Sequence, residues 1–198
     1  MISFDNTTGI TTRQRWSHYF TIMMGVLAII VLFNLRGTYS SEVSIYQNNE
    51  EGIVAYYPRG WLIDEQQPER YIFRTRDMQA IGFKTTFQLS IRTVSDETAQ
   101  RTVVDTLTME RAQTRTAYRL LSIEDYDGLT DAITAIATYQ FVEVDPNPFL
   151  EGVPIVVRGV DVITISRDQA IIITMLSDFN EFDSNFVLFE RFLRQLEL

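Results

Sequence analysis

Cysteine does not occur in this 198-residue sequence, and histidine occurs only once, as His18. The lack of cysteine excludes disulfide bonds, thiol nucleophiles and cysteine-ligated metal centres. A single histidine near the N-terminus excludes a histidine-dependent catalytic triad and a metal site built from several imidazoles. Glycine-rich phosphate-binding loops are missing too, since the nine glycines are scattered singly. We therefore expect no catalytic residue, no cofactor and no metal, and predict that the protein is not an enzyme.

Basic residues are few compared with acidic ones. The chain has 17 Lys and Arg against 26 Asp and Glu, which gives a formal net charge of −9. Such a surface repels the phosphates of nucleic acids and the headgroups of anionic lipids. We therefore expect no nucleic-acid partner and no nucleotide ligand. Hydrophobic residues make up 45% of the chain, enough for an ordinary globular core, so global disorder is excluded.

A long uncharged segment lies near the N-terminus, from Trp16 to Leu35. Its length and apolar character predict a transmembrane helix over residues 16–36, because a span needs ~20 mostly apolar residues. Two arginines, Arg13 and Arg15, precede the segment, and Arg36 alone follows it closely. The positive-inside rule then places the tail of residues 1–15 in the cytoplasm and the rest outside. The residues expected to contact membrane lipid or integral membrane subunits are Trp16, Tyr19, Phe20, Met24, Leu27, Ile30 and Phe33.

Two other interpretations of this segment remain open. A basic start followed by an apolar core is also typical of a cleaved signal peptide, although the apolar run is long for one. A buried core helix is the third, although such helices are seldom apolar on every side. His18 is predicted to be an interfacial side chain, with ligation of a haem or chlorophyll-type pigment as the alternative.

The remainder of the chain is predicted to be a linker over residues 37–51 and one folded domain over 52–198. Alternation is clearest around Phe87, Leu89 and Ile91, which would share the buried face of a strand. By such patterns and by turn residues, strands are predicted over residues 53–57, 71–75, 85–93, 118–125, 132–144, 155–166 and 170–176. Short connections between successive strands favour an antiparallel sheet.

Two helices complete the predicted domain. The first would start at Asp96 as the N-terminal cap and end near Thr114. The second would follow Asp178 or Asn180, and its apolar stripe has the spacing of one helix face. That stripe consists of Phe182, Phe186, Phe189, Leu193 and Leu196. The predicted fold class is α+β, an antiparallel sheet flanked by two α-helices and preceded by the transmembrane helix.

The run Tyr-Pro-Arg-Gly-Trp over residues 57–61 ends the first predicted strand of the domain. Together with the order of elements and the closing amphipathic helix, it resembles the PsbP-like family, which includes the photosystem II extrinsic protein and bacterial membrane-anchored relatives. The resemblance covers about residues 52–198. It implies an α/β/α sandwich that docks onto or assists a membrane complex rather than a common reaction.

Three functional hypotheses follow. The first is a non-catalytic accessory subunit of a membrane complex, such as an energy-transducing one, with an acidic extracytoplasmic docking domain. The second is a membrane-tethered module that binds a small molecule or lipid, and the third is a carboxylate-based hydrolase. Tyr56, Tyr57 and Trp61 are candidates for lining a cleft or a protein contact, with core packing as the alternative. Residues 124–128 contain acidic groups, but they lack the spacing of a calcium loop and are interpreted as a turn.

Overall fold

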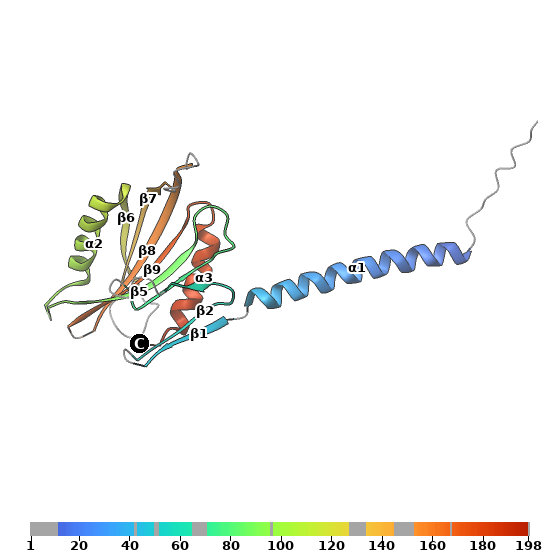
Figure 1. The fold of residues 1–198 in the computed structure, drawn as a ribbon, viewed down its shortest axis with the longest axis horizontal. Coiled ribbons are helices and arrows are strands. Elements are labelled where there is room, and N and C mark those ends of the chain that lie inside the picture. Colours follow the sequence, from blue (N-terminus) through green and yellow to red (C-terminus); the bar gives the residue numbers. More distant parts are fainter. Residues whose placement is uncertain are drawn as a thin grey trace, which may run out of the picture. The chain divides into compact units, whose positions relative to one another are not determined.

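The computed structural model describes residues 12–41, 43–49, 52–64, 71–95, 97–126, 134–144, 153–166 and 168–197, and the side chains of α1 only from residue 16 to 32. The chain divides into two compact units, Met1–Glu42 and Val43–Leu198. Helix α1 (Thr12–Ser41) forms the first unit. The second holds all the strands and the other two helices (Figure 1).

The prediction of a transmembrane helix over residues 16–36 is not supported. In the described part of the chain, no helix combines the length and the apolar character that crossing a membrane requires. Ser17, His18 and Asn34 limit the apolar run to Tyr19–Phe33, which is shorter than the ~20 residues of a typical span.

Nine strands dominate the second unit. They are β1 (Val43–Asn48), β2 (Ile53–Pro58), β3 (Leu62–Ile63), β4 (Phe73–Arg76), β5 (Thr86–Thr93), β6 (Thr116–Tyr126), β7 (Thr134–Glu143), β8 (Ile155–Ser166) and β9 (Gln169–Asp178). Strands β1 and β2 form an antiparallel hairpin, and the other seven form an antiparallel sheet in the order β3-β4-β5-β9-β8-β7-β6. Strand β1 falls in the segment that the sequence assigns to a linker.

The predicted α+β class is therefore wrong, and the fold is mostly β. The strands β6 to β9 each have ten or more residues, whereas α2 (Gln100–Thr114) has 15 residues and α3 (Phe182–Gln195) has 14. Both helices are short covers on a large sheet, and they pack against its opposite faces (Figure 1). The sequence patterns located seven of the nine strands, all but β1 and β3, but did not indicate how far the strands outweigh the helices.

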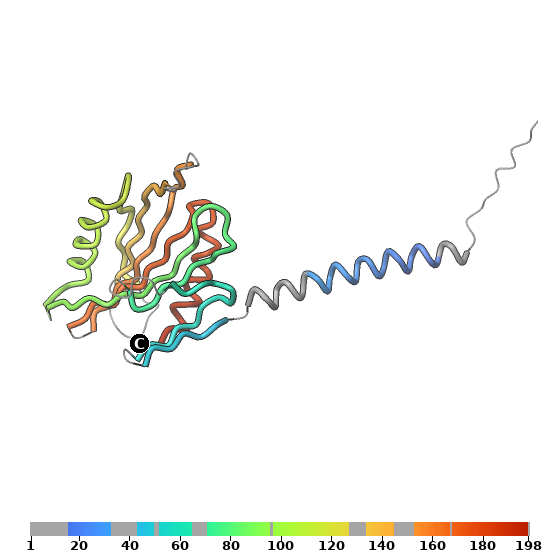
Figure 2. Tube along the Cα trace, viewed as in Figure 1, coloured from blue at the N-terminus to red at the C-terminus, as the bar shows by residue number. Residues whose placement is uncertain are grey.

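Aromatic side chains fill the core between the sheet and α3. Phe189 and Phe192 are almost fully buried, and each ring centroid lies 5.3 Å from that of Phe87 in β5. The end of the chain returns to the hairpin (Figure 2), where Val54 and Glu197 exchange two backbone hydrogen bonds of 3.1 and 3.0 Å. The hairpin and the chain end thus close this side of the core.

A smaller apolar core lies under α2. Val103, Val104 and Leu107 of the helix pack on Ile163 of β8 and Ile172 of β9. These residues follow the spacing of one helix face, which is why this segment is helical and why it lies flat on the sheet. Helix α2 contacts β6, β7 and β8.

The helix starts differ from those predicted. Asp96 lies outside the described residues, and α2 begins at Gln100 without a side-chain cap. Helix α3 follows Glu181, which also makes no side-chain cap. Asp178 instead accepts a hydrogen bond of 2.8 Å from the backbone N–H of Asn180 and so shapes the turn before the helix.

Candidate functional site

Polar side chains form a row across the α2-facing side of the sheet. Arg74 of β4 is paired with Gln88 of β5, which is paired with Thr174 of β9, and Thr174 is paired with Asp161 of β8. Paired residues on neighbouring strands point to the same face, and so do residues two apart on one strand. Arg76 therefore shares this face. Because α2 packs over β6, β7 and β8, one end of the row is covered by the helix and the other lies beside it.

The covered end of the row is built around Asp161. This carboxylate is only 1% exposed, and the Arg111 guanidinium from α2 donates to both of its oxygens, to Oδ1 at 3.0 Å. Thr174 donates its hydroxyl to Oδ1 at 2.7 Å, and Tyr139 donates its hydroxyl at 3.4 Å. The buried carboxylate is thus both paired with a cation and hydrogen-bonded, which offsets the cost of burying it.

The electrostatics of this cluster follow from its burial. Burial alone lowers the pKa of Arg111, but the Asp161 carboxylate outweighs it, so the pKa of the guanidinium is raised. Burial also raises the pKa of Tyr139 well above its usual value. The Arg111 guanidinium lies over the Tyr139 ring at 4.3 Å, and a Cβ at Gly159 would overlap the same ring. Glycine is therefore required there, and the tightly packed cluster leaves its carboxylate no route to a substrate.

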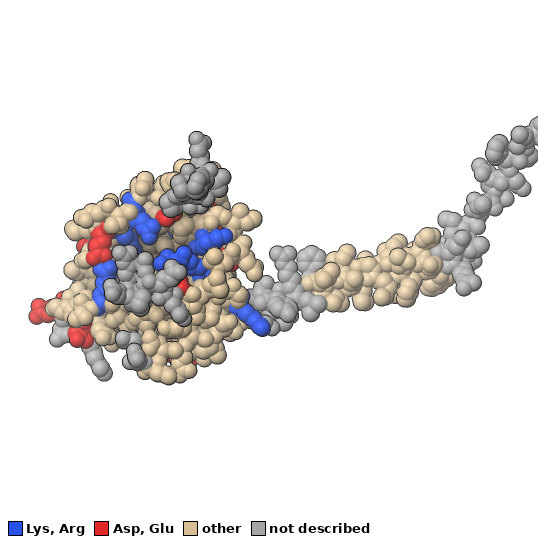
Figure 3. Space-filling view, viewed as in Figure 1, with Lys and Arg blue, Asp and Glu red and all other residues tan. Residues whose placement is uncertain are grey.

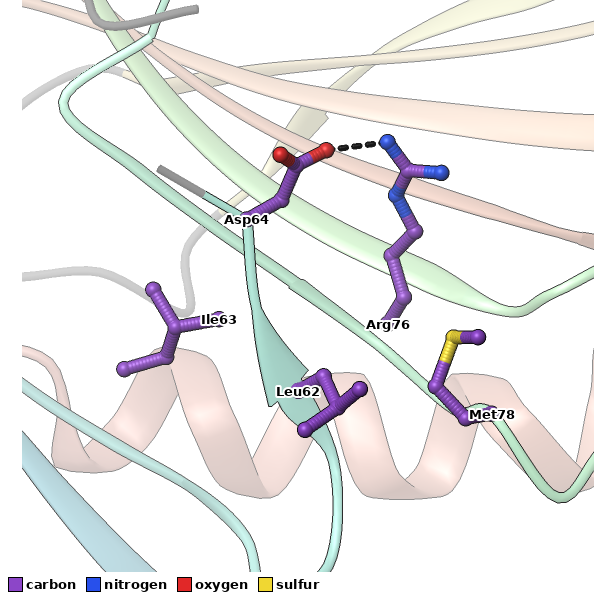
Figure 4. A pocket seen from close by; sticks show the side chains of 5 residues that line it. All are labelled: Leu62, Ile63, Asp64, Arg76 and Met78. Atoms are coloured by element: carbon purple, nitrogen blue, oxygen red, sulfur yellow. Dashed lines mark hydrogen bonds and ion pairs between the residues drawn. The ribbon is translucent and has the colours of Figure 1, made fainter. Parts of the chain in front are cut away.

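The other end of the row opens into a hollow at the edge of the sheet. It has a volume of about 200 Å³ and is lined by Leu62, Ile63, Asp64, Arg76 and Met78. Figure 4 shows the Asp64 carboxylate, just after β3, and the Arg76 guanidinium of β4 pointing toward each other, joined by an ion pair. Strand β3 is the terminal strand of the sheet, so the hollow lies at the sheet edge.

Arg74 is a second cation beside this hollow, although it is not among the residues that line it. Its Nη1 lies 3.8 Å from the same Asp64 oxygen that pairs with Arg76. Burial lowers the pKa of Arg74, and the like charge of Arg76 lowers it further, against the opposing effects of Tyr71 and Asp64. Two guanidinium groups therefore share one carboxylate.

Two hydrogen-bond donors near this hollow are unused. The buried Nε atoms of Arg74 and Arg76 have no hydrogen-bond partner among the described residues. The Arg74 guanidinium also lies over the Tyr71 ring at 5.2 Å. Buried polar groups are nearly always paired, so a cluster of unpaired donors is a feature that calls for a ligand or a partner.

Basic side chains lie together on one visible face of the folded unit (Figure 3), although the chain as a whole is acidic. Figure 3 shows Lys and Arg gathered over the middle of the folded unit in this view. Next to the polar row, Arg92 of β5 forms two hydrogen bonds of 2.8 Å with Glu110 of α2. Arg92 and Arg111 are thus each matched by a carboxylate of their own, whereas among the described residues Arg74 and Arg76 share the single carboxylate of Asp64.

The aromatic residues predicted to line a cleft lie against the other core. Tyr57 packs on Phe73 with ring centroids 5.8 Å apart, and Trp61 packs on Phe87 at 4.7 Å. Tyr56 is half-buried in β2. The structure therefore places Tyr57 and Trp61 in the α3-side core, and none of the three lines the hollow.

The residues predicted to contact lipid lie along α1. Trp16, Tyr19, Phe20, Met24, Leu27 and Ile30 are all exposed in the structure, and the side chain of Phe33 lies outside the described residues. The described residues hold no group of three or more His, Cys, Asp or Glu side chains that could bind a metal. Of the acidic segment 124–128, the last two residues are not described.

Sequence reasoning missed the residues of both charged clusters. Two signals were available: Arg74 and Arg76 alternate on a short strand, and Asp161 interrupts an otherwise apolar strand. The first indicates two cations on one face, and the second indicates a buried charge that needs a partner. Neither signal identifies Asp64 or Arg111 as the partner.

The fold is similar to that of PsbP-like proteins of known structure. The solution structure of cyanobacterial PsbP (CyanoP) from Synechocystis sp. PCC 6803 superposes with a TM-score of 0.57 at 14% identity, covering 80% of this chain and 93% of that one. LpqN, which is involved in cell envelope biogenesis of Mycobacterium tuberculosis, superposes with a TM-score of 0.53 at 8% identity, covering 78% and 89%.

The PsbP-like resemblance drawn from the sequence is thus confirmed at the level of the fold. No family model matches the sequence, and a search of curated proteins finds no relative. A shared fold does not by itself assign a function, so the function has to be argued from the surfaces of this chain.

Proposed function

We propose that the protein is a non-catalytic accessory subunit of a protein assembly in the cell envelope, with its folded unit on the extracytoplasmic side. The fold it shares with cyanobacterial PsbP, and with LpqN, a protein involved in cell envelope biogenesis, supports this class of role. The covered cluster also supports it, because Asp161, the one carboxylate that is fully buried among the described residues, is held by Arg111, Thr174 and Tyr139.

The observation that carries the proposal is the apolar surface of α1. Between Trp16 and Leu32, large apolar side chains on all sides of this helix are exposed; Ile22 is 64% exposed and Leu32 65%. Keeping apolar surface in water costs roughly 25 cal/mol per Å². A continuous apolar surface of this kind marks a contact with other apolar molecules. The subunits of the assembly are the partners that bury it.

The alternative role, a module that binds a small molecule or lipid, is supported less well. Pockets for small ligands commonly measure about 300–1,000 Å³. The hollow at the sheet edge measures about 200 Å³, and the groove beside α2 that includes Arg92 and Val103 measures about 260 Å³. Both are smaller than such ligands need but large enough for a side chain of a partner.

Native gel electrophoresis after mild detergent extraction tests the proposal. The full chain of 22.9 kDa should migrate in a band of much higher mass, together with a partner in fixed stoichiometry. Leu27→Glu should release the chain from that band, because it places a charge in the middle of the apolar surface. Leu27→Ile is the matched control and should leave the band unchanged.

The folded unit should be unaffected by either substitution, because α1 belongs to a separate compact unit. Equal thermal unfolding of the two variants would establish that lost association is not lost folding. Migration of the native chain as a lone species under mild conditions would contradict the proposal.

A further inference from the structure

We infer that the hollow at the β3–β4 edge binds an acidic side chain of the partner polypeptide, with apolar neighbours of that side chain seated on Leu62 and Met78. This inference rests on the proposed function, because the partner is a subunit of the same assembly. It names the chemistry by which the folded unit recognises that subunit.

The charge at the hollow selects a monoanion. Arg74 and Arg76 carry two positive charges, and Asp64 supplies one negative charge to both. Counted over the described residues, one positive charge is therefore left over, which a single carboxylate neutralises. A phosphate dianion would bring one negative charge too many, and the nearby Asp64 carboxylate would repel it.

The geometry of the cations also favours a carboxylate. The Arg76 side chain is 37% exposed, so part of its guanidinium is accessible from the hollow, whereas Asp64 is only 12% exposed. A guanidinium presents its N–H groups in a planar fork that matches the two oxygens of a carboxylate. The carboxylate of a partner can therefore lie on the free side of Arg76 while Asp64 holds the other side.

Unpaired hydrogen-bond donors favour an anion at the hollow. A buried donor without a partner loses its hydration without compensation. The Nε atoms of Arg74 and Arg76 are two such donors among the described residues. An anion that draws the two guanidinium groups toward it gives these donors an acceptor, which favours the occupied state.

The walls of the hollow indicate what flanks the carboxylate. Leu62 is 58% exposed and Met78 is 48% exposed, and both line the hollow beside Arg76. Methionine is a flexible side chain that adapts to different apolar partners. A partner segment with an acidic residue between apolar residues would cover the arginine and the two apolar side chains together.

Size and net charge argue against other anionic partners. A volume of about 200 Å³ accepts one side chain and its neighbours but not a nucleotide or a lipid headgroup with its chains. The chain as a whole carries a net charge of −9, which disfavours approach to nucleic acid or to an anionic membrane. A single acidic side chain on a partner experiences much less of this repulsion.

Side-chain NMR of the full ¹⁵N-labelled protein tests the inference, because the Nε–H groups of the two arginines report on the hollow directly. The probe is the peptide acetyl-Leu-Glu-Leu-amide, and the comparison is acetyl-Leu-Gln-Leu-amide. The acidic peptide should shift the Arg74 and Arg76 Nε–H signals and should bind about tenfold more tightly than the neutral one. Sodium acetate at the same concentration should give a weaker response, because it lacks the apolar residues.

Matched variants locate the binding. Arg76→Gln and, independently, Arg74→Gln should each weaken binding of the acidic peptide by about tenfold or more. Arg92→Gln is the control, because Arg92 lies on the same face but is matched by Glu110. Equal binding of the two peptides, an equal loss in Arg92→Gln, or no shift with the acidic peptide would each overturn the inference.

The two proposals fail in distinguishable ways. If the chain co-migrates with its assembly but the acidic peptide shifts neither arginine, the accessory role stands and the hollow is not the recognition site. If the peptide binds as expected but the native chain migrates alone, the hollow binds acidic segments and the accessory role is wrong.

Discussion

Two clusters of arginine and carboxylate lie on the same face of one sheet, and they are built differently. At the covered end, Arg111 and Asp161 are matched one to one, and hydroxyl groups complete the carboxylate. At the edge, Arg74 and Arg76 share Asp64, and two donors have no acceptor among the described residues. In the described part of the chain, the charges of the first cluster balance, whereas the second cluster has one more positive charge than negative charges.

We interpret this difference as one between a structural role for the covered cluster and the proposed binding role for the edge cluster. The buried Arg111–Asp161 pair joins α2 to the sheet. Its charges neutralise each other, so a ligand would gain no interaction there. Two arginines that share one carboxylate contribute little to the stability of the fold. Their remaining hydrogen-bond donors and positive charge can instead interact with a partner. Sites of this kind are often kept at the expense of stability. The comparison can be tested by measuring how much the loss of an arginine from each cluster lowers the stability of the fold.

The largest expected effect comes from Arg111→Met compared with Arg74→Met. The first leaves the Asp161 charge buried and unpaired, so the free energy of unfolding should fall by about 3–5 kcal/mol. The second removes one of two like charges, so the free energy of unfolding should stay unchanged or rise by up to ~1 kcal/mol. Urea unfolding followed by circular dichroism measures both. Similar losses in the two variants would end the distinction between the clusters.

A smaller effect is expected when the packing of the covered cluster is disturbed. Gly159→Ala places a Cβ where the Tyr139 ring lies, and the ring must move away from Arg111 and Asp161. Overpacking of this kind costs about 1–3 kcal/mol, seen as a lower midpoint in urea. Gly25→Ala in α1 is the control, since no other atom lies near that position. A Gly159→Ala protein as stable as the parent would show that the ring is not held by the cluster.

The smallest effect is expected at the exposed pair between the two clusters. Hydrogen bonds from Arg92 lower the pKa of Glu110. A carboxylate whose pKa is lower in the folded state stabilises the fold above its unfolded pKa of about 4.3, and this contribution is lost as the pH falls through the folded pKa. Both side chains are more than 40% exposed, so Glu110→Gln should cost less than about 1 kcal/mol at pH 7. In urea titrations the cost should disappear in acid; a cost of several kcal/mol would mean that this pair is also structural.

Periodic elements of the fold could be predicted well from sequence. The spacing of its phenylalanines predicts helix α3, because only a helix places these apolar residues on one face that can pack against the sheet. Strand β5 was located from alternation at Phe87, Leu89 and Ile91 for a similar reason. Strand β3, with two residues, is too short to show any period, and β1 is half-exposed along its length.

The charged clusters could be predicted only in part. The alternation of Arg74 and Arg76 indicates a shared face, but the partner Asp64 lies just after a different strand, β3. Arg111 and Asp161 are 50 positions apart, and their contact depends on where α2 lies on the sheet. A sequence pattern shows the periodicity of its apolar residues, and so the type of element, but not where that element packs in the fold. Similarly, the uncharged run of α1 indicated a membrane span that no described helix provides.

The pairing of β5 with β9 has a consequence for the order of assembly. It brings Thr85 beside Ser177, 92 positions later in the chain, whereas β6 to β9 follow one another as hairpins. Strands β3, β4 and β5 therefore gain their neighbour in the sheet only after β9 has been synthesised, and a short isolated ribbon is marginally stable in water. We expect the edge hollow to mature last, so that only finished molecules recognise the partner. Pulse-labelled hydrogen exchange should find β8 protected before β4, and protection in the reverse order would rule this out.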